Sequence, residues 1–365
     1  MNNPNKNTDC VCVLGGGNFG TTLANLISLN GYQVNFWLRS EEQVRHINQK
    51  HRNFKYMPEV KLDPQIQATT NLKQAVSSAR LLIFALPSKA FRTVFEQVVP
   101  YLSIQHMLVS TTKGVYKEDV SKNNFQLTSE LMEEILHHRN HLPTNIPKGV
   151  ISGPNLAKEI IAKQPTATVI ASKSSTLSNY VKQVLTNDYF RVYINTDIKG
   201  VELGGALKNC YAIASGIIDA LGMGDNTKSM LLTRALAEMN RFAVSFGASP
   251  LTFLGLTGIG DLIVTCLSPL SRNYNVGYQL GSGKPLDYAL DHINGVSEGI
   301  SSIKLVYQKA RAHNINMPLL TAVYQIIYQN QPTRTTLING LTHHQNDLDV
   351  EFDFTGQSII HETHH

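Results

Sequence analysis

The chain has 365 residues, of which 42% are hydrophobic and 16% are charged, so it can bury ordinary globular cores in two domains. Its net charge of +5 comes without a dense basic run interleaved with aromatic residues, which argues against a nucleic-acid-binding protein. The four cysteines include no CxxC pair, and Cys10 and Cys12 stand two apart in an apolar run, where we expect buried, reduced thiols on one face of a strand.

The N-terminal sequence MNNPNKNTDC lacks the apolar core of a signal peptide. No apolar stretch approaches the roughly 18 residues that a membrane-spanning helix needs. We therefore expect a cytoplasmic protein without membrane insertion.

In chain order, the first half alternates short apolar runs with segments of helical spacing. The runs predict strands at residues 10–14, 33–38, 81–86, 107–111, 150–152, 167–171 and 190–194. Helices are predicted from the first run to about residue 30, at 88–99 and at 127–136. Continuous apolar strands that alternate with helices indicate a parallel sheet covered on both faces.

After about residue 197 the strand signal stops. Apolar residues at helical spacing predict helices at 202–221, 228–247, 298–314 and 319–330. We therefore expect an α/β domain at 8–197, an all-α domain at 198–340 and an irregular polar tail at 341–365.

A glycine-rich loop follows the first predicted strand. Residues 15–20 read GGGNFG, which matches G-x-G-x-x-G with Gly15, Gly17 and Gly20 at the glycine positions. The pattern is weak by itself, but here it stands between a strand and a helix, as dinucleotide binding requires. Gly15 permits the tight turn, Gly17 lets the backbone approach a pyrophosphate, and Gly20 allows the helix to pack closely on the strand. The sequence thus predicts a Rossmann-type dinucleotide site with the phosphates at a helix N-terminus.

The second predicted strand ends beside Arg39. An NAD-specific site usually carries Asp or Glu near this position to bind the ribose 2′-hydroxyl. A guanidinium instead suits a 2′-phosphate, which it can bind through two hydrogen bonds. We therefore expect NADPH to be the preferred cofactor, with NADH as the second.

Several short motifs follow one another along the rest of the chain. They are KG at 113–114, SGPNLAKE at 152–159, LGGALKN at 203–209, GIGDL at 258–262, SRN at 271–273 and VSEG at 296–299. Together they resemble NAD(P)-dependent glycerol-3-phosphate dehydrogenases of the bacterial type, over about residues 10–335. The motifs GPNLAKE, LGGALKN and SRN are specific, whereas the glycine loop alone is not.

This resemblance implies an α/β Rossmann-type N-terminal domain plus an all-α C-terminal domain like that of 6-phosphogluconate dehydrogenase. It also implies the reversible reduction of dihydroxyacetone phosphate to sn-glycerol 3-phosphate, which supplies glycerophospholipid biosynthesis. By position, Lys208 corresponds to the catalytic proton donor and acceptor, and Lys113 to a contact of both substrate and nicotinamide. The other substrate positions are Gly153, Asn155, Asp261, Ser271, Arg272 and Asn273. The other cofactor positions are Asn18, Phe19, Arg39, Ala157, Arg272, Val296 and Glu298.

The sequence departs from the family pattern at a few places. Asn155 stands where many members have Ser or Thr, and Phe19 replaces the commoner Trp or Tyr. The residues from about 341 have no counterpart in the family.

The chemistry of the carried-over residues is consistent with this assignment. Hydride addition to a ketone leaves an alkoxide, which must be stabilised and protonated. Lys208 is predicted on an apolar helix and can supply the proton, while Asp261 can orient it or balance its charge. Arg272 and Asn273 can bind the phosphate of the substrate.

Two other interpretations stay open on the residues alone. One is another enzyme of similar architecture, such as a β-hydroxyacid dehydrogenase or a ketopantoate reductase. The other is a non-catalytic NADP-binding sensor, which would not need Lys208, Asp261 and Arg272 together.

The residues HETHH at 361–365 match the zinc-protease pattern H-E-x-x-H, but we expect no metal site because a folded helix and a third ligand are missing. The oligomeric state is not fixed by the sequence, which leaves a homodimer open.

Overall fold

The computed structural model describes residues 9–117, 125–138, 145–293 and 297–342. They form two compact units. The N-terminal unit covers the described residues up to Tyr116 and from Gln126 to Ile198, and the helical unit continues from Lys199. The predicted cofactor residue Val296 and the pattern at 361–365 lie outside the described residues. Within the described part of the chain, no helix is both long and apolar enough to cross a bilayer.

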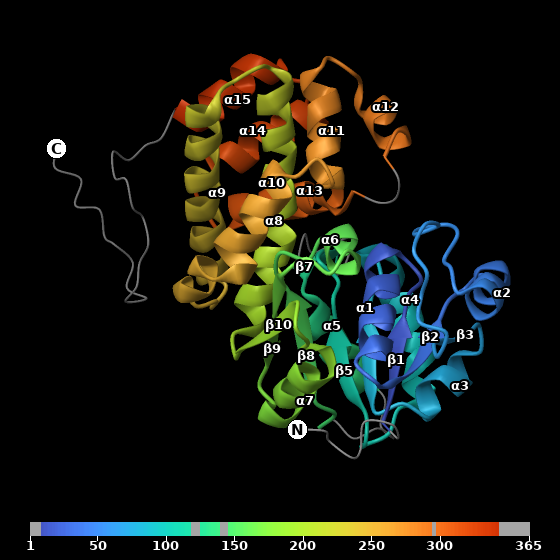
Figure 1. The fold of residues 1–365 in the computed structure, drawn as a ribbon. Coiled ribbons are helices and arrows are strands. Elements are labelled where there is room, and N and C mark those ends of the chain that lie inside the picture. The colour runs from blue at the N-terminus through green and yellow to red at the C-terminus, as the bar shows by residue number, and fades with distance from the viewer. Residues whose placement is uncertain (1–8, 118–124, 139–144, 294–296, 343–365) are drawn as a thin grey trace. The chain divides into compact units, whose positions relative to one another are not determined.

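The N-terminal unit is built on an eight-stranded sheet of order β10-β9-β8-β5-β4-β1-β2-β3 (Figure 1). The strands are β1 (Cys10–Leu14), β2 (Gln33–Trp37), β3 (Gln67–Thr69), β4 (Leu81–Phe84), β5 (Met107–Ser110), β8 (Lys148–Ser152), β9 (Thr166–Ser172) and β10 (Phe190–Asn195). Two short strands, β6 (Tyr116–Lys117) and β7 (Phe125–Gln126), are not part of this sheet. All the strands of the large sheet except β3 lie where the apolar runs predict them.

The prediction of a parallel sheet is wrong at one pair of strands. β8 and β9 are antiparallel, with Gly149 opposite Ser172, whereas β9 and β10 are parallel to each other. The helix between β8 and β9 is α6 (Ala157–Ile161), which has five residues and is therefore about 8 Å long. A parallel connection must return the chain along the full strand, and this short helix does not span that length.

Helices cover both faces of the sheet, as the sequence predicts. Val11 and Val13 of β1 belong to one buried cluster, and Cys10, Cys12 and Leu14 belong to the cluster on the other face. Both cysteines are buried, unpaired thiols, and burial raises the pKa of the Cys12 thiol well above its ordinary value. The helices of the unit are α1 (Asn18–Leu29), α2 (Glu41–Lys50), α3 (Leu72–Ser77), α4 (Ser88–Val98), α5 (Thr128–His137), α6 and α7 (Ser175–Leu185), with a 3₁₀ turn at Val99–Tyr101.

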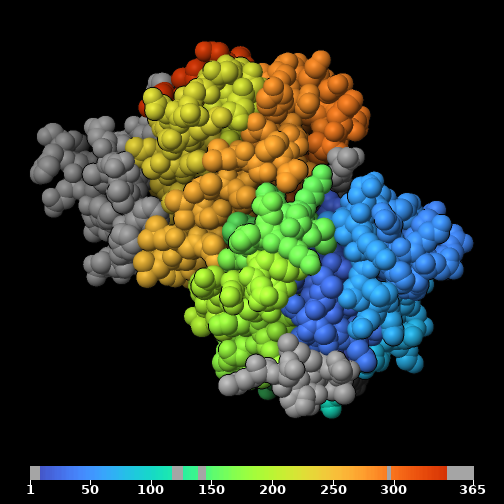
Figure 2. Space-filling view, viewed as in Figure 1, coloured from blue at the N-terminus to red at the C-terminus, as the bar shows by residue number. Residues whose placement is uncertain are grey.

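The helical unit is organised around α8 (Ile198–Ala220), which is buried continuously from Gly200 to Ile218. A helix that is apolar on every side is stable when other helices surround it. Those helices are α9 (Asp225–Ser245), α10 (Asp261–Leu267), α11 (Arg272–Gly281), α12 (Leu286–Asp291), α13 (Glu298–Ala312), α14 (Pro318–Tyr328) and α15 (Thr333–Thr342), with a 3₁₀ turn at Pro250–Leu254 and a π turn at Leu256–Gly260. In the space-filling view, α9 and α11 reach the surface of this unit (Figure 2).

α8 and α11 approach so closely that glycine is required at their contact. A Cβ atom on Gly277 of α11 would lie 1.9 Å from the carbonyl oxygen of Ile213 on α8. A Cβ atom on Gly216 of α8 would lie 2.0 Å from the carbonyl oxygen of Tyr274 on α11. Because these obstacles are backbone atoms, a side chain at either position would push the two helices apart. This contact fixes the position of α11 relative to α8.

A buried carboxylate joins α9 to the start of α14. Glu238 accepts hydrogen bonds from the backbone nitrogens of Leu319 (2.7 Å) and Leu320 (3.0 Å) and from the hydroxyl of Tyr211 (2.9 Å). The first amides of a helix lack intrahelical partners and carry positive partial charge, which suits a carboxylate. Burial nevertheless raises the pKa of Glu238 to about 7, because desolvation outweighs the hydrogen bonds and the charge of Arg241 that oppose it.

The raised pKa of Glu238 predicts that folding stability depends on pH. The folded protein binds more protons than the unfolded chain between about pH 4.5 and 7, so the free energy of unfolding falls as the pH rises through this range. Glu238→Gln removes the titration. Relative to this variant, the wild type should lose up to about 3 kcal/mol between about pH 5 and pH 8. Urea unfolding of both proteins at the two pH values measures this difference. Asp291→Asn, which alters an exposed carboxylate of the same unit, is the control and should show no such change. A difference between wild type and Glu238→Gln that stays constant with pH would contradict the assignment.

Candidate functional site

The glycine loop between β1 and α1 has the backbone geometry that dinucleotide binding needs. Gly15 has a φ of +119°, in the region that L side chains rarely adopt, and a Cβ atom there would lie 2.4 Å from the carbonyl oxygen of Ala85. A Cβ atom on Gly20 would lie 1.9 Å from the carbonyl oxygen of Gly15, so α1 packs directly on the loop. A Cβ atom built on Gly17 would have no other atom within 4 Å.

Gly17 is the N-cap of α1, and the predicted residues Asn18, Phe19 and Gly20 form the first turn of that helix. The amides of a first helical turn have no intrahelical partner and attract anions. No acidic residue stands in this turn. The residues present therefore fit the pyrophosphate of NAD(P).

Two further cofactor predictions fall on elements beside this loop. Arg39 is exposed and follows β2, immediately before Ser40, whose hydroxyl accepts a hydrogen bond from the backbone nitrogen of Gln43 and so caps α2. Ala157 opens α6, and its carbonyl oxygen accepts a hydrogen bond of 3.5 Å from the hydroxyl of Thr22 on α1. The cofactor roles of Arg39 and Ala157 stay predictions.

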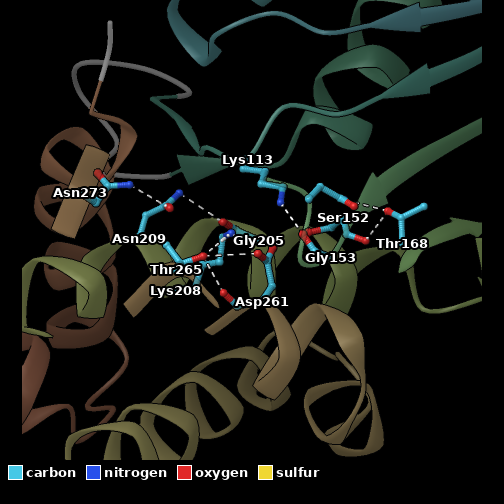
Figure 3. Close-up of polar contacts among 11 residues, drawn as sticks. Lys113, Ser152, Gly153, Thr168, Gly205, Lys208, Asn209, Asp261, Thr265 and Asn273 are labelled. Carbon is cyan, nitrogen blue, oxygen red and sulfur yellow. Dashed lines mark hydrogen bonds and ion pairs between the residues drawn. The ribbon is translucent and has the colours of Figure 1, made fainter. Parts of the chain in front are cut away.

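The predicted residues Lys113 and Gly153 lie together in the N-terminal unit. The Nζ atom of Lys113 donates a hydrogen bond to the carbonyl oxygen of Gly153 at 2.8 Å (Figure 3). Gly153 has a φ of +140°, which a side chain would strain. The backbone that follows β8 therefore turns in a way that presents its carbonyl group to this lysine.

Asn155, which differs from the Ser or Thr of the family pattern, is held by its neighbours. Its Nδ2 atom donates to the hydroxyl of Thr168 on β9 at 2.8 Å, and that hydroxyl donates to the carbonyl oxygen of Ser152 at 3.0 Å. The Oδ1 atom of Asn155 is buried and has no hydrogen-bond partner among the described residues. A fixed amide with an unused acceptor is suited to receive a hydrogen bond from a hydroxyl group.

Lys208 is the buried cation of the helical unit. Its side chain comes from the middle of α8 and is 6% exposed, and its Nζ atom forms a hydrogen-bonded ion pair with Asp261 of α10 (Figure 3). The Nζ atom also donates to the hydroxyl of Thr265 at 2.8 Å, and that hydroxyl donates to the backbone oxygen of Asp261. A buried ammonium needs a counter-charge and hydrogen-bond acceptors, and these two residues provide both.

Thr265 is a residue of this cluster that the sequence analysis missed. It follows Asp261 by four residues on α10, and this spacing places both side chains on one face of a helix. The signal was therefore present once Asp261 was placed at the start of the helix.

A second polar cluster surrounds Asn273 on α11. Its Nδ2 atom donates to Oδ1 of Asn209 at 2.9 Å, and its Oδ1 atom accepts from the hydroxyl of Ser297 at 2.6 Å and the backbone nitrogen of Gly299 at 3.0 Å. Asn273 is thereby bonded to both neighbours of Glu298, which opens α13. Asn209, the last residue of LGGALKN, is a second residue of the site that has no assignment from the sequence.

The remaining predicted substrate residues flank Asn273. The hydroxyl of Ser271 accepts a hydrogen bond of 3.3 Å from the backbone nitrogen of Tyr274 and caps α11. Arg272 is exposed on the first turn of the same helix. Among the described residues, no group of three or more His, Cys, Asp or Glu side chains could hold a metal ion.

Two family models match the chain. Residues 10–178 match the N-terminal part and residues 197–338 the C-terminal part of NAD-dependent glycerol-3-phosphate dehydrogenase. The chain is 48% identical over 340 residues to glycerol-3-phosphate dehydrogenase (NAD(P)+) of Alcanivorax borkumensis, which covers 93% of this chain and 95% of that protein. It is 46% identical over 342 residues to the enzyme of the same name from Acinetobacter baylyi, covering 94% of this chain and 92% of that protein.

A solved structure agrees with these matches. The crystal structure of glycerol-3-phosphate dehydrogenase from Coxiella burnetii superposes with a TM-score of 0.84 at 32% identity and covers 92% of this chain and 99% of that one. The motif resemblance, the Rossmann-type sheet and the all-helical second unit all point in the same direction. The chain belongs to the NAD-dependent glycerol-3-phosphate dehydrogenase family.

Proposed function

We propose that this chain catalyses the reversible, NAD(P)H-dependent reduction of dihydroxyacetone phosphate to sn-glycerol 3-phosphate. The observation that carries the proposal is the buried cluster of Lys208, Asp261 and Thr265. Lys208 belongs to the LGGALKN motif and Asp261 to the GIGDL motif. The family match makes a β-hydroxyacid dehydrogenase or a ketopantoate reductase the less favoured assignment. A sensor would have no use for a buried ammonium, because burying a charge costs several kcal/mol that partners only partly return.

In this reaction the cofactor supplies the hydride and Lys208 supplies the proton. The reduced nicotinamide supplies the hydride when it is bound. As the C2 carbonyl becomes an alkoxide, the Lys208 ammonium stabilises the developing charge and transfers a proton to the oxygen. In the reverse direction the neutral amine of Lys208 accepts the proton of the C2 hydroxyl. Asp261 and Thr265 hold the Nζ atom in place during both transfers.

The substrate phosphate needs cationic and amide donors. Arg272 and Ser271 stand at the start of α11, where the first backbone amides and a guanidinium can both meet a phosphate. Lys113, Gly153 and Asn155 contact the rest of the substrate in this proposal. Arg39 favours NADPH over NADH, and the product serves glycerophospholipid synthesis.

Arg272→Ala tests the proposed recognition of the phosphate. Removing a charge-assisted contact should lower kcat/KM for dihydroxyacetone phosphate by about 10- to 150-fold, because such hydrogen bonds contribute about 1.5–3 kcal/mol. The loss should be much smaller for unphosphorylated dihydroxyacetone, which is already a poor substrate in this account. Arg334→Ala, at an exposed position on α15, is the control and should leave both values unchanged. Equal losses for both substrates would mean that Arg272 does not recognise the phosphate.

A further inference from the structure

A fully buried asparagine lies behind the glycine loop. Asn53 follows α2 in the segment HRNFKYMP and is 0% exposed. Its backbone oxygen accepts hydrogen bonds from the nitrogens of Tyr56 (3.2 Å) and Met57 (2.8 Å), which close a turn and fix the residue. Asparagine in a loop is normally solvated, so complete burial requires that every polar atom of its side chain has a partner.

The side chain of Asn53 meets this requirement through the glycine loop. Its Nδ2 atom donates to the carbonyl oxygen of Gly16 at 2.9 Å and to the hydroxyl of Thr21 at 2.8 Å. Its Oδ1 atom accepts from Nε2 of Gln43 on α2 at 3.0 Å. Both amide hydrogens are thus used, one on the middle of the loop and one on α1. Thr21 is also 0% exposed and Gln43 is 7% exposed, so the bonds of Asn53 to these two side chains are buried.

The bond to Gly16 orients the amide that follows it. In a planar trans peptide the carbonyl oxygen of one residue and the N–H of the next point in opposite directions. Because Asn53 holds the Gly16 oxygen, the Gly17 N–H points away from Asn53. A Cβ atom built on Gly17 would have no other atom within 4 Å, so this part of the loop is open to a ligand. A side chain on Gly16 would require Leu38 to move, since a Cβ atom there would lie 2.1 Å from Cδ2 of Leu38.

We propose that Asn53 is a positioning residue for the cofactor: it holds the Gly16–Gly17 peptide and the first turns of α1 in the arrangement that binds the pyrophosphate. This inference rests on the proposed function, because it concerns the cofactor site of that reaction. Asn53 acts through the loop and does not touch the reacting atoms. Its contribution should therefore appear in the binding of every cofactor that carries a pyrophosphate, and equally for NADPH and NADH.

The test is fluorescence titration of the full-length protein with NADPH and NADH, for wild type, Asn53→Asp and Asn53→Ala. Asn53→Asp keeps the shape and removes both donors. Because both variants remove the bond that orients the Gly16–Gly17 peptide, they should raise Kd about 10- to 30-fold, which corresponds to about 1.4–2 kcal/mol. The ratio of the Kd values for NADH and NADPH should stay within about 2-fold of the wild type, and kcat at saturating cofactor within about 5-fold, on the same reasoning.

Asn48→Ala is the matched control for lost structural hydrogen bonds. The Asn48 side chain is on α2 and pairs with the backbone nitrogen and oxygen of Ala68, each at 2.9 Å. It makes two hydrogen bonds but has none to the glycine loop, so its removal should leave Kd within about 2-fold of the wild type. Gln43→Met offers a second, milder variant. It removes the one bond to Asn53 Oδ1 and should raise Kd about 3-fold, so the inference stays testable if the Asn53 variants do not fold.

Together, the possible outcomes distinguish a failure of the role of Asn53 from a failure of the proposed function. Wild type that fails to bind either nucleotide would overturn both. Wild type that binds NADPH, with Asn53 variants or Gln43→Met that bind equally well, would overturn the role of Asn53 alone. A Kd increase that the Asn48→Ala control shows to the same extent would reduce Asn53 to a structural residue and also overturn the role. The titration needs no turnover, so a failure to reduce dihydroxyacetone phosphate would leave the result for Asn53 standing.

Discussion

Lys208→Ala should lower kcat for the reduction of dihydroxyacetone phosphate by about 10²–10⁴, because the reaction loses its positioned proton donor. Binding of NADPH should stay within a few-fold of the wild type, since the glycine loop belongs to the N-terminal unit. The measurement is steady-state kinetics at saturating substrate, combined with fluorescence titration of NADPH. A variant with near-wild-type kcat would contradict the assignment of Lys208.

Stability has to be separated from catalysis in this experiment. Lys208→Ala leaves the buried Asp261 without its counter-charge, and breaking a buried pair costs about 3–5 kcal/mol. The double variant Lys208→Ala/Asp261→Ala removes both charges and should recover part of the melting temperature but none of the activity. Lys228→Ala breaks a second ion pair of the helical unit, with Asp219, and serves as the control. Its kcat should match the wild type.

Arg39→Asp should reverse the cofactor preference. In the wild type, the guanidinium that follows β2 is expected to bind the 2′-phosphate of NADPH, and a charge-assisted contact of about 1.5–3 kcal/mol gives a preference of roughly 10- to 150-fold over NADH. An aspartate at this position removes the contact, repels the phosphate and can accept hydrogen bonds from the ribose hydroxyls. The measurement is kcat/KM for both cofactors in both proteins.

The control for Arg39 is Arg45→Asp, which makes the same change of charge at an exposed position of α2. It should leave the ratio of the two kcat/KM values unchanged. If the wild type uses NADH as well as NADPH and Arg39→Asp alters neither value, Arg39 is a surface residue with no part in cofactor choice. Stacking of the guanidinium on the adenine would help both cofactors equally and would reduce the preference.

The fold could be predicted wherever a buried element appears in the sequence as an apolar run or as apolar residues at helical spacing. The apolar runs CVCVL and LLIF became β1 and β4, and the apolar stretch around LGGALKN became the buried α8. β3 was missed because its three residues, QAT, carry little apolar signal. The antiparallel direction of β9 was missed because burial on both faces looks the same whichever way a strand runs.

The site was predictable to the extent that motifs mark it. The motifs identified Lys208 and Asp261 as candidate site residues. The two side chains are 53 residues apart in the chain, and their ion pair agrees with the prediction that Asp261 balances the charge of Lys208. Asn209 and Thr265 stand inside or next to those motifs and could have been added. Asn53 could not, because a polar residue in the polar segment HRNFKYMP has the pattern of a surface loop. Its burial depends on contacts with Gly16 and Thr21, which no local periodicity reveals.

The most direct test of the central claim is the oxidation of NADPH by the purified protein in the presence of dihydroxyacetone phosphate. The substrate is compared with ketopantoate and other 2-ketoacids under the same conditions, and the product is identified by chiral chromatography coupled to mass spectrometry. We expect oxidation that requires dihydroxyacetone phosphate, formation of sn-glycerol 3-phosphate, and a kcat/KM for the 2-ketoacids at least about 100-fold lower, since the phosphate contacts are missing. Reduction of a 2-ketoacid in preference to dihydroxyacetone phosphate, or tight binding of NADPH with no turnover of any of these substrates, would contradict it.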